Sequence, residues 1–509
     1  MKVLTTAEMR EVDSRTIEMG IPGIVLMENA AHRVVEFLAG HCAPLSAERI
    51  LVLCGKGNNG GDGMAIARQL FTRFHPRALH VVLFASPEAL KGDAAANYKM
   101  LEVCGCPVAR EIPAGARSAT LVIDALVGTG VAGAATGRML EAIREVNRGF
   151  PLAKVLAVDI PSGMAADSGE SPGEFARADY TVTFTAPKWA HALPPNCDHV
   201  GKLAVGAIGS PAALFEHVWL SLLEPAMFHE LLGPRPRSGH KGTFGHVLIV
   251  AGSRGKTGAA AMSGLGALRA GAGLVTVASA ASAIAEIASH APELMTEPLA
   301  ETPMGSVALN AALDAIAEGK TVVAMGPGLG RHPDIAMLVS SAVESFPQHM
   351  VLDADALSPR IAGAAGRVRV LTPHPGEMAR LAGNTAAEVQ ADRVGTARAF
   401  AQSHAVTLVL KGERTVIAFP DGRVWINPTG TPAMGTGGSG DILTGLISGF
   451  LAQFPKQADQ AVAAAVYLHG LAGEIGARAL GEKSLIASDI LKYLPEAISE
   501  ARGDVSHRL

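Results

Sequence analysis

The chain has 509 residues, which is more than one hydrophobic core usually supports, so we expect two domains. Hydrophobic residues make up 49% of the chain and charged residues 18%, a composition that is typical of a packed globular protein and excludes a mainly disordered one. The net charge of -4, without any block of like charge, lacks the basic footprint of a nucleic-acid-binding protein.

The first forty residues predict two helices, and the strands of a sheet follow them. Thr5 or Thr6 caps the first helix, and the second carries apolar residues at helical spacing between Leu26 and Leu38. Fully apolar strands that alternate with helices predict a parallel sheet covered on both faces, a Rossmann-like three-layer α/β/α sandwich. The runs that predict its strands are 50–54, 79–84, 121–123, 155–158, 181–184 and 203–208.

A second series of strands begins after a segment rich in glycine, proline and arginine at 233–240. We place the domain boundary after residue 222, which gives domains of residues 1–222 and 223–509. Near the end of the chain, runs at 414–419 and 423–426 flank Pro420-Asp421-Gly422 and predict a β-hairpin. The other apolar runs predict a second α/β domain and lie at 247–250, 274–278, 321–325, 350–352, 368–371 and 407–410.

The first glycine-rich segment, Gly55-Lys-Gly-Asn-Asn-Gly-Gly-Asp-Gly63, directly follows a predicted strand. It predicts a turn before a helix at 64–71, at the sheet edge where open α/β sheets bind ligands. Its glycines fit the dinucleotide pattern G-x-G-x-x-G. However, the strand at 79–84 ends without the ribose-binding carboxylate of a dehydrogenase, and Asp62 would repel a diphosphate. The amides and the carboxylate favour a cation site, or a polar cradle for a sugar or ring.

Two later strand ends carry carboxylates, Asp124 before Ala-Leu-Val-Gly-Thr-Gly130 and Asp159 before Ile-Pro-Ser-Gly163. Because parallel strands end at the same sheet edge, we expect these aspartates and the first glycine-rich segment to line one crevice. The alternative for each motif alone is that the aspartates cap helices and the glycines make tight turns. The presence of all three motifs favours the crevice.

At these residues, over about 1–220, the chain resembles the NAD(P)H-hydrate epimerases. The resemblance implies that the R and S forms of hydrated NADH and NADPH interconvert by loss and re-addition of water at ring carbon 6. Asp159 is our candidate for the acid–base group, and Lys188 either assists it or is a surface charge. The resemblance implies a K⁺ ion bound by Asn59, Asp124 and Ser162. It places the hydrated nucleotide against Asp159 and against Asn58, Asn59, Gly60, Gly61, Asp62, Gly128, Thr129, Gly130, Val131, Ala132, Gly133 and Ala134.

The second glycine-rich segment, Asn427 to Asp441, precedes a predicted helix at 442–451. Gly437, Gly438 and Gly440 can present backbone N–H groups to an anion at the start of this helix. Asp441 lies beside them, and such a carboxylate can accept the proton of an attacking hydroxyl during phosphoryl transfer. The alternative is a flexible loop in which Asp441 only caps the helix.

This segment is similar to the ribokinase-like superfamily, and three more motifs narrow the resemblance to the ADP/ATP-dependent NAD(P)H-hydrate dehydratases over about 225–500. These motifs are Gly326-Pro-Gly-Leu-Gly330, Thr372-Pro-His-Pro-Gly-Glu377 and Lys411-Gly-Glu-Arg-Thr415. The resemblance implies that the S hydrate binds Ala260, Gly328, His374 and Asp441, with Asp441 as general base; His374 is otherwise a turn residue between prolines. It implies that ADP or ATP, with Mg²⁺, binds Lys411, Gly412, Glu413, Arg414, Thr415 and Gly440.

Together the two resemblances predict a bifunctional enzyme that repairs hydrated nicotinamide cofactors, an isomerase fused to a lyase. Three alternatives are a vitamin or sugar kinase, a non-catalytic nucleotide sensor and an NAD-dependent dehydrogenase; the epimerase-like half argues against the kinase. The partners we expect are small molecules and further copies of the chain in a homo-oligomer. The five cysteines cannot form a complete disulfide set, and no apolar stretch reaches about 18 residues, so we expect no membrane contact and a cytoplasmic location.

Overall fold

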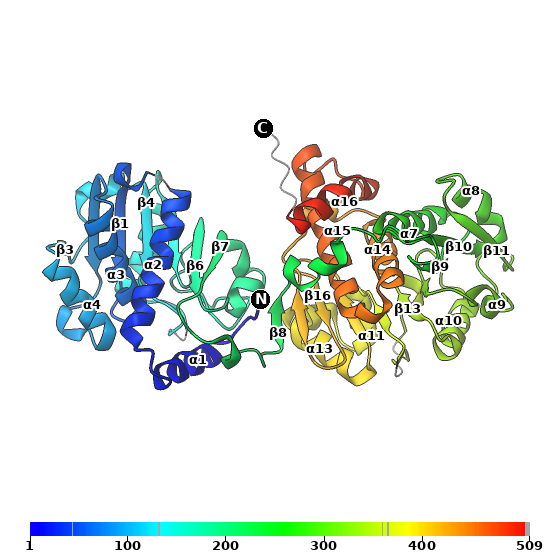
Figure 1. Cartoon of the computed structure of the whole chain (residues 1–509), viewed down its shortest axis with the longest axis horizontal. Coiled ribbons are helices and arrows are strands. Elements are labelled where there is room, and N and C mark those ends of the chain that lie inside the picture. Colours follow the sequence, from blue (N-terminus) through cyan, green and yellow to red (C-terminus); the bar gives the residue numbers. More distant parts are fainter. Residues whose placement is uncertain (43, 131–132, 359, 364–365, 504–509) are drawn as a thin grey trace. The chain divides into compact units, whose positions relative to one another are not determined.

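The computed structural model describes residues 1–42, 44–130, 133–358, 360–363 and 366–503. It divides into two compact units, Met1–Leu220 and Ser221–Leu509, whereas the sequence placed the boundary after residue 222. Each unit is an α/β structure built around its own sheet (Figure 1). Within the described ranges, no helix combines the length and the apolar character needed to cross a lipid bilayer.

The first unit contains a seven-stranded parallel sheet in the order β3-β2-β1-β4-β5-β6-β7. All six strands predicted from the sequence are confirmed to within two residues. The seventh, β3, spans only two residues and is too short to give an apolar pattern. The strands are β1 Arg49–Cys54, β2 Ala78–Leu83, β3 Val108–Ala109, β4 Leu121–Ala125, β5 Lys154–Val158, β6 Tyr180–Phe184 and β7 Lys202–Gly206.

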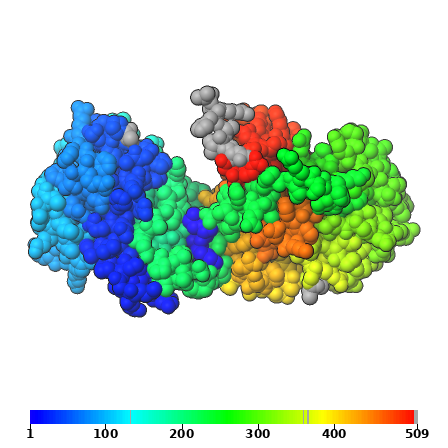
Figure 2. Space-filling view, viewed as in Figure 1, coloured from blue at the N-terminus to red at the C-terminus, as the bar shows by residue number. Residues whose placement is uncertain are grey.

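Helices cover both faces of this sheet, which confirms the predicted three-layer sandwich. Alternate residues of β1 show the two faces, because Ile50 and Val52 share a core with α2 and α3, while Leu51 and Leu53 share one with α5. The predicted N-terminal helices form part of the surface of this unit (dark blue in Figure 2). The helices are α1 Thr6–Glu18, α2 Gly23–His41, α3 Asn58–Arg73, α4 Gly92–Val103, α5 Gly137–Arg148 and α6 Trp189–Ala192.

The first glycine-rich segment is mostly helix rather than turn. α3 begins at Asn58, six residues before the predicted start at residue 64, so only residues 55–57 link it to β1. Close packing explains the glycines: a Cβ atom on Gly60 would lie 1.9 Å from the Gly55 carbonyl oxygen, and one on Gly63 would lie 2.6 Å from the Ala125 Cβ. The helix can therefore begin directly against the ends of β1 and β4.

Gly60→Ala is expected to destabilise the first unit by about 2–3 kcal/mol, because the new methyl group would overlap backbone that cannot move aside. Gly57→Ala is the matched control, since a Cβ atom there would meet nothing within 4 Å. The midpoint of urea denaturation measures both changes. Equal midpoints for the two variants would show that this packing is not tight.

The second unit contains a ten-stranded sheet in the order β11-β10-β9-β12-β13-β14-β15-β16-β17-β8. The strands from β11 to β15 are parallel, and β15, β16 and β17 pair antiparallel, which confirms the predicted hairpin. The sequence missed the short β8 and also β11, whose Glu297 and Pro298 interrupt its apolar pattern. The strands are β8 Leu220–Leu222, β9 His246–Val250, β10 Leu274–Ala280, β11 Met295–Leu299, β12 Val322–Met325, β13 His349–Leu352, β14 Arg369–Leu371, β15 Thr407–Leu410, β16 Val416–Ala418 and β17 Val424–Ile426.

Two helical layers also enclose this sheet. α7, α14, α15 and α16 share a core with one face, and α10, α11 and α13 lie on the other side (Figure 1). α14 begins at Ser439 with Gly438 as its N-cap, at φ +97°, so the prediction that it starts at residue 442 was three residues late. The helices are α7 Thr257–Ala270, α8 Ile284–Ala288, α9 Leu313–Ala317, α10 Pro333–Ser345, α11 Pro375–Ala382, α12 Ala386–Ala391, α13 Arg393–His404, α14 Ser439–Gln453, α15 Ala458–Leu480 and α16 Ala487–Arg502.

Strand order indicates where each unit would bind a ligand. The order reverses between β1 and β4 in the first sheet and between β9 and β12 in the second. Open α/β sheets bind ligands beyond the carboxyl ends of the strands at such a reversal. The glycine-rich segments and strand-end aspartates of each unit follow the carboxyl ends of its strands.

Candidate active sites

Asp124 and Ser162 meet at the end of β4. The buried Asp124 carboxylate accepts hydrogen bonds from the Ser162 backbone N–H at 2.9 Å and from the Ser162 hydroxyl at 2.5 Å. Ser162 Oγ in turn accepts a hydrogen bond from the Val127 N–H at 2.9 Å. Burial raises the pKa of Asp124, and the hydrogen bonds from Ser162 oppose this rise. The pair is a compact group of oxygen atoms below the loop that follows β4.

Asn59, the second residue of α3, is buried next to this loop. A Cβ atom on Gly128 would lie 3.3 Å from the Asn59 Cβ and 3.6 Å from its Oδ1. Neither Oδ1 nor Nδ2 of Asn59 has a hydrogen-bond partner among the described residues. A buried polar group without a partner costs about 1–3 kcal/mol, so this amide indicates a position prepared for a ligand.

Asp159 follows β5 and forms an ion pair with a buried lysine. Lys188 Nζ lies 2.6 Å from Asp159 Oδ1, and the Thr183 hydroxyl donates to the same oxygen at 2.9 Å. The surface-charge alternative for Lys188 is therefore wrong, since its side chain is only 2% exposed. Burial opposes ionisation of Asp159, but the charge and hydrogen bond of Lys188 outweigh it and lower the pKa of this carboxyl group.

The backbone of Asp159 is unusual as well. Its φ is +66°, in the left-handed region that residues other than glycine seldom occupy. Such a conformation costs about 1–3 kcal/mol and persists where the surroundings hold it, often at functional sites. Asp159 is thus fixed in both its backbone and its side chain.

The remaining predicted residues of the first site lie at different depths. Gly60 and Gly61 are buried in α3, Asp62 is half-buried and Asn58 is exposed. The pKa of Asp62 is raised well above its usual value by burial and by the negative charges of Asp159 and Asp13, which places all three carboxyl groups in one electrostatic cluster. Of the loop after β4, Gly128 and Thr129 are half-buried, Gly130, Gly133 and Ala134 are exposed, and Val131 and Ala132 lie outside the described residues.

In the second unit, the ends of β9 and β12 are joined by hydrogen bonds. Gly252 N–H donates to the Pro327 carbonyl at 2.8 Å, and the Ser253 hydroxyl donates to the Gly328 carbonyl at 2.7 Å. Gly328 has a φ of +66°, and a Cβ atom on it would lie 2.9 Å from the Lys256 carbonyl oxygen. Ala260, on α7, is fully buried behind this junction. Glycine at position 328 therefore permits a left-handed, closely packed backbone where the sheet order reverses.

A polar cluster surrounds the first turn of α14. Lys411 Nζ lies 2.7 Å from Oδ1 of the buried Asp353, and the Thr444 hydroxyl donates to Asp353 Oδ2 at 2.9 Å. A Cβ atom on Gly440 would lie only 3.3 Å from Lys411 Nζ. Burial and the charge of Asp353 raise the pKa of Asp441 to about 6, and Lys411 opposes this rise. Asp441 is the third residue of α14, so its alternative role as N-cap is wrong.

Asp353 and Arg393 are residues that the sequence reasoning missed. Asp353 directly follows β13, and its place after an apolar run was the same signal that identified Asp124 and Asp159. Arg393, in the first turn of α13, donates to the carbonyls of Leu410 at 3.1 Å, Lys411 at 3.2 Å and Glu413 at 2.6 Å. No local pattern identifies Arg393, because its role depends on a loop distant in sequence.

The other predicted nucleotide and hydrate residues are more exposed. Gly412 and Glu413 are exposed, and Arg414 and Thr415 are half-buried. His374 caps α11, because its Nδ1 accepts hydrogen bonds from the N–H groups of Gly376 at 3.1 Å and Glu377 at 3.3 Å. This capping agrees with the alternative of a turn residue, and binding of the hydrate by His374 stays a prediction.

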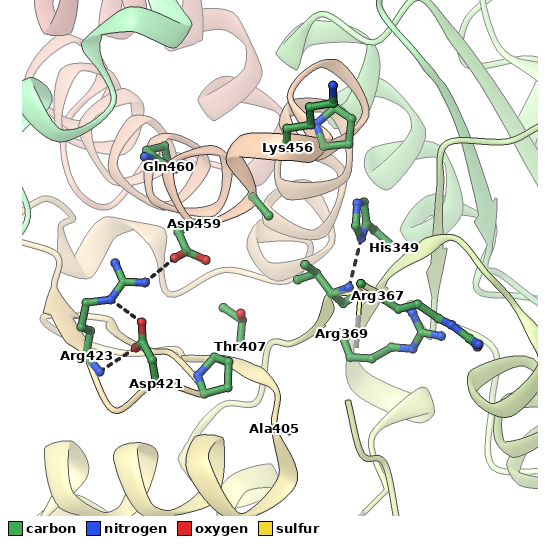
Figure 3. A pocket seen from close by; sticks show the side chains of 15 residues that line it. His349, Arg367, Arg369, Ala405, Thr407, Asp421, Arg423, Lys456, Asp459 and Gln460 are labelled. Atoms are coloured by element: carbon green, nitrogen blue, oxygen red, sulfur yellow. Dashed lines mark hydrogen bonds and ion pairs between the residues drawn. The ribbon is translucent and has the colours of Figure 1, made fainter. Parts of the chain in front are cut away.

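A cavity of about 470 Å³ lies at the opposite edge of the second sheet (Figure 3). His349 and Thr407, which line it, are the first residues of β13 and β15. Its two aspartates pair with one arginine, since Arg423 binds Asp421 at 2.5 Å and Asp459 at 2.6 Å. This cavity is therefore separate from the site around Asp441.

Comparison with known proteins identifies both halves. Residues 247–496 match the family model described as NAD(P)H-hydrate dehydratase, and residues 23–190 match that of the YjeF-related protein N-terminus. A bifunctional NAD(P)H-hydrate repair enzyme of Moorella thermoacetica is 42% identical over 525 residues, covering 99% of this chain and 98% of the relative. The corresponding enzyme of Escherichia coli is 35% identical over 465 residues, covering 91% of this chain and 87% of the relative.

The second unit also has a solved structural relative. The crystal structure of ADP/ATP-dependent NAD(P)H-hydrate dehydratase from Bacillus subtilis, co-crystallised with ATP/Mg²⁺, is 34% identical with a TM-score of 0.51. It covers 55% of this chain and 98% of the relative. These matches confirm both resemblances and the predicted ribokinase-like fold of the second unit. The chain belongs to the family of bifunctional NAD(P)H-hydrate repair enzymes.

Proposed function

We propose that the chain epimerises hydrated NADH and NADPH in its first unit and dehydrates the S form with ADP or ATP in its second. The observation that carries the proposal is that each unit holds fixed carboxylates at the carboxyl ends of its parallel strands, the sheet edge where its glycine-rich segments also lie. Asp159 with Lys188 serves the first reaction, and Asp441 beside Lys411 and Asp353 serves the second.

In the dehydration, the ring hydroxyl of the S hydrate attacks the terminal phosphoryl group, and Asp441 accepts the hydroxyl proton. The N–H groups at the start of α14 and the ammonium group of Lys411 stabilise the phosphoryl charge. The phosphorylated oxygen then leaves ring carbon 6 with its electron pair, and loss of a proton from carbon 5 restores the dihydropyridine. Phosphorylation thus turns a poor leaving group into a good one.

Mg²⁺ bound with the nucleotide would neutralise charge on its phosphates, as phosphoryl transfer generally requires. The buried carboxylate of Asp353, next to Gly440, is a hard oxygen ligand suited to this ion. Lys411 and Thr444 hold that carboxylate in place. The donor set of the second unit therefore fits a nucleotide–Mg²⁺ complex.

The first unit offers a site for K⁺. Asn59, Asp124 and Ser162 supply amide, carboxylate and hydroxyl oxygens with a single formal negative charge, and oxygen donors suit a hard cation. The partnerless buried Oδ1 of Asn59 supports this assignment, because a bound cation would satisfy it. In the reaction these residues fix the loop around Gly128 against the nucleotide.

Asn59→Leu is expected to abolish conversion of the R hydrate without lowering the stability of the first unit. Leucine has a similar volume, and it removes an amide that lacks hydrogen bonds, so the free energy of unfolding should stay the same or rise. Wild-type conversion of the R hydrate should require K⁺ in the buffer. Thermal unfolding and R-hydrate turnover measure the two effects; a variant that keeps K⁺-dependent turnover would contradict the assignment.

The proposed function is tested with the pure R and S hydrates of NADH, each incubated with ADP or ATP. Recovery of the reduced-nicotinamide absorbance from both hydrates is the expected result. Recovery from the S hydrate alone would contradict the epimerase assignment. In a parallel incubation of sugars or vitamins with ATP, a stable phosphorylated product, without any recovery from the hydrates, would favour the kinase alternative.

A further inference from the structure

The epimerase site contains a carboxyl group that the sequence analysis did not identify. Asp13 lies on α1, and its Oδ1 is buried without a hydrogen-bond partner among the described residues. Burial raises the pKa of Asp13 to about 6; the charge of Lys188 opposes this rise, and the charge of Asp159 adds to it. Asp13 thus interacts with both members of the ion pair described above.

Several contacts fix α1 next to this ion pair. Leu4 forms an isolated parallel bridge with Lys188, and its N–H donates to the Pro187 carbonyl at 2.9 Å. Val12, the neighbour of Asp13, shares a small apolar cluster with Leu4 and Ala186. The segment that carries Lys188 is therefore packed against the helix that carries Asp13.

The N-terminal end of α1 is anchored as well. The N–H and the hydroxyl of Thr6 donate to Asp167 Oδ1 at 2.5 and 2.9 Å, and Thr5 caps the helix with Glu8 in a reciprocal pair of hydrogen bonds. An anchored helix holds the Asp13 side chain in one place. None of these contacts provides a hydrogen-bond partner for the buried Oδ1 of Asp13.

We propose that Asp13 is a second catalytic carboxyl group of the epimerase site, acting on the C6 hydroxyl from the face of the ring opposite Asp159 and Lys188. The inference rests on the proposed epimerase function. Inversion at one carbon requires water to leave from one face and to return on the other, and two carboxyl groups on opposite faces can serve these two steps.

Asp13 donates its proton to the C6 hydroxyl, the C6–O bond breaks with its electron pair on oxygen, and the lone pair of the ring nitrogen forms a C=N⁺ bond. Water then adds to the opposite face of C6, Asp159 accepts a proton from it, and the C=N⁺ electron pair returns to the nitrogen. Proton exchange with solvent resets both carboxyl groups, and the reverse reaction exchanges their roles.

The electrostatics favour this division. Lys188 holds the Asp159 carboxyl group ionised, whereas burial keeps part of Asp13 protonated near neutral pH. Asp62 and His191 also interact with the Asp159–Lys188 ion pair; burial raises the pKa of Asp62, and it lowers that of His191 to about 3. Two carboxyl groups with pKa values moved in opposite directions are the pattern of an acid and a base.

Asp13→Asn in the full chain tests the inference. The variant should convert the pure R hydrate, in the presence of nucleotide, at least about 100-fold more slowly than the wild type, the size of effect that general acid catalysis gives. Dehydration of the S hydrate should be unchanged, because it uses the second unit. Wild-type turnover of the R hydrate, corrected for the enzyme-free rate, should fall as the pH rises above about 6, and this fall should be absent in the variant.

Two further variants separate catalysis from folding. Ser14→Ala, at the neighbouring exposed position of α1, should keep wild-type turnover of the R hydrate. Asp13→Ala should be rescued in part by added formate, which can occupy the vacated position and donate a proton. Three results would overturn the inference. Asp13→Asn could turn over the R hydrate at the wild-type rate, or it could be slow but still lose activity as the pH rises above about 6. The third is that formate does not restore any activity to Asp13→Ala. A wild-type enzyme that dehydrates the S hydrate but never converts the R hydrate would instead contradict the epimerase function.

Discussion

Asp441→Asn is expected to lower kcat for dehydration of the S hydrate by about 100- to 10,000-fold, the range that general base catalysis supplies. Asparagine has nearly the same shape and leaves the N–H groups at the start of α14 in place, so nucleotide affinity should change little. Turnover of the pure S hydrate and calorimetric titration with ADP and ATP measure the two quantities.

The pH dependence gives the same prediction a second test. A general base must be ionised, and burial raises the pKa of Asp441 to about 6, so wild-type dehydration should fall as the pH drops below about 6. The residual activity of Asp441→Asn should lack this fall. Asp314→Asn, at an exposed position of α9, is the matched control and should behave as the wild type. A full wild-type rate in Asp441→Asn would exclude Asp441 as the base.

Asp159→Asn is expected to reduce turnover of the R hydrate by about 100-fold or more and also to destabilise the first unit. The loss of stability arises because the buried Lys188 ammonium group would lose its charge partner, which costs about 3–5 kcal/mol. Thermal unfolding and R-hydrate turnover measure the two effects.

The double variant Asp159→Asn, Lys188→Met separates the effect on turnover from the effect on stability. Removing both charges should restore most of the stability, because no unpaired charge stays buried, but it should not restore turnover. Because the pKa of Asp159 is lowered, the stability from the ion pair should be present at neutral pH and lost as the pH falls below about 4. Recovery of turnover in the double variant would show that Asp159 acts only on stability.

The strands were predictable because parallel strands buried on both faces leave continuous aliphatic runs in the sequence. The first residues of the helices were harder to predict. α3 and α14 begin within glycine-rich segments, where local propensity disfavours a helix but packing against strand ends and neighbouring helices permits one. The strands β3, β8 and β11 escaped notice because they are very short or lie at an edge with an interrupted pattern.

The candidate sites divide in the same way. Asp124, Asp159 and Asp441 were predictable, since each is next to a strand end or a glycine-rich helix start. Asp353 carried the same signal and was overlooked. Asp13 was not predictable from a local pattern, because tertiary contacts such as the bridge between Leu4 and Lys188 bring α1 to the site. Pairing of Asp159 with a buried Lys188 likewise required the tertiary structure.

The most direct test of two separate reactions mixes two inactivated proteins, Asp159→Asn and Asp441→Asn, with pure R hydrate and nucleotide. With either protein alone, the reduced-nicotinamide absorbance should recover no faster than the R hydrate converts to the S hydrate without enzyme. The mixture should restore the absorbance much faster, because Asp441→Asn supplies the S hydrate that Asp159→Asn dehydrates. A mixture no faster than either protein alone, or recovery by Asp159→Asn by itself, would contradict this division of labour.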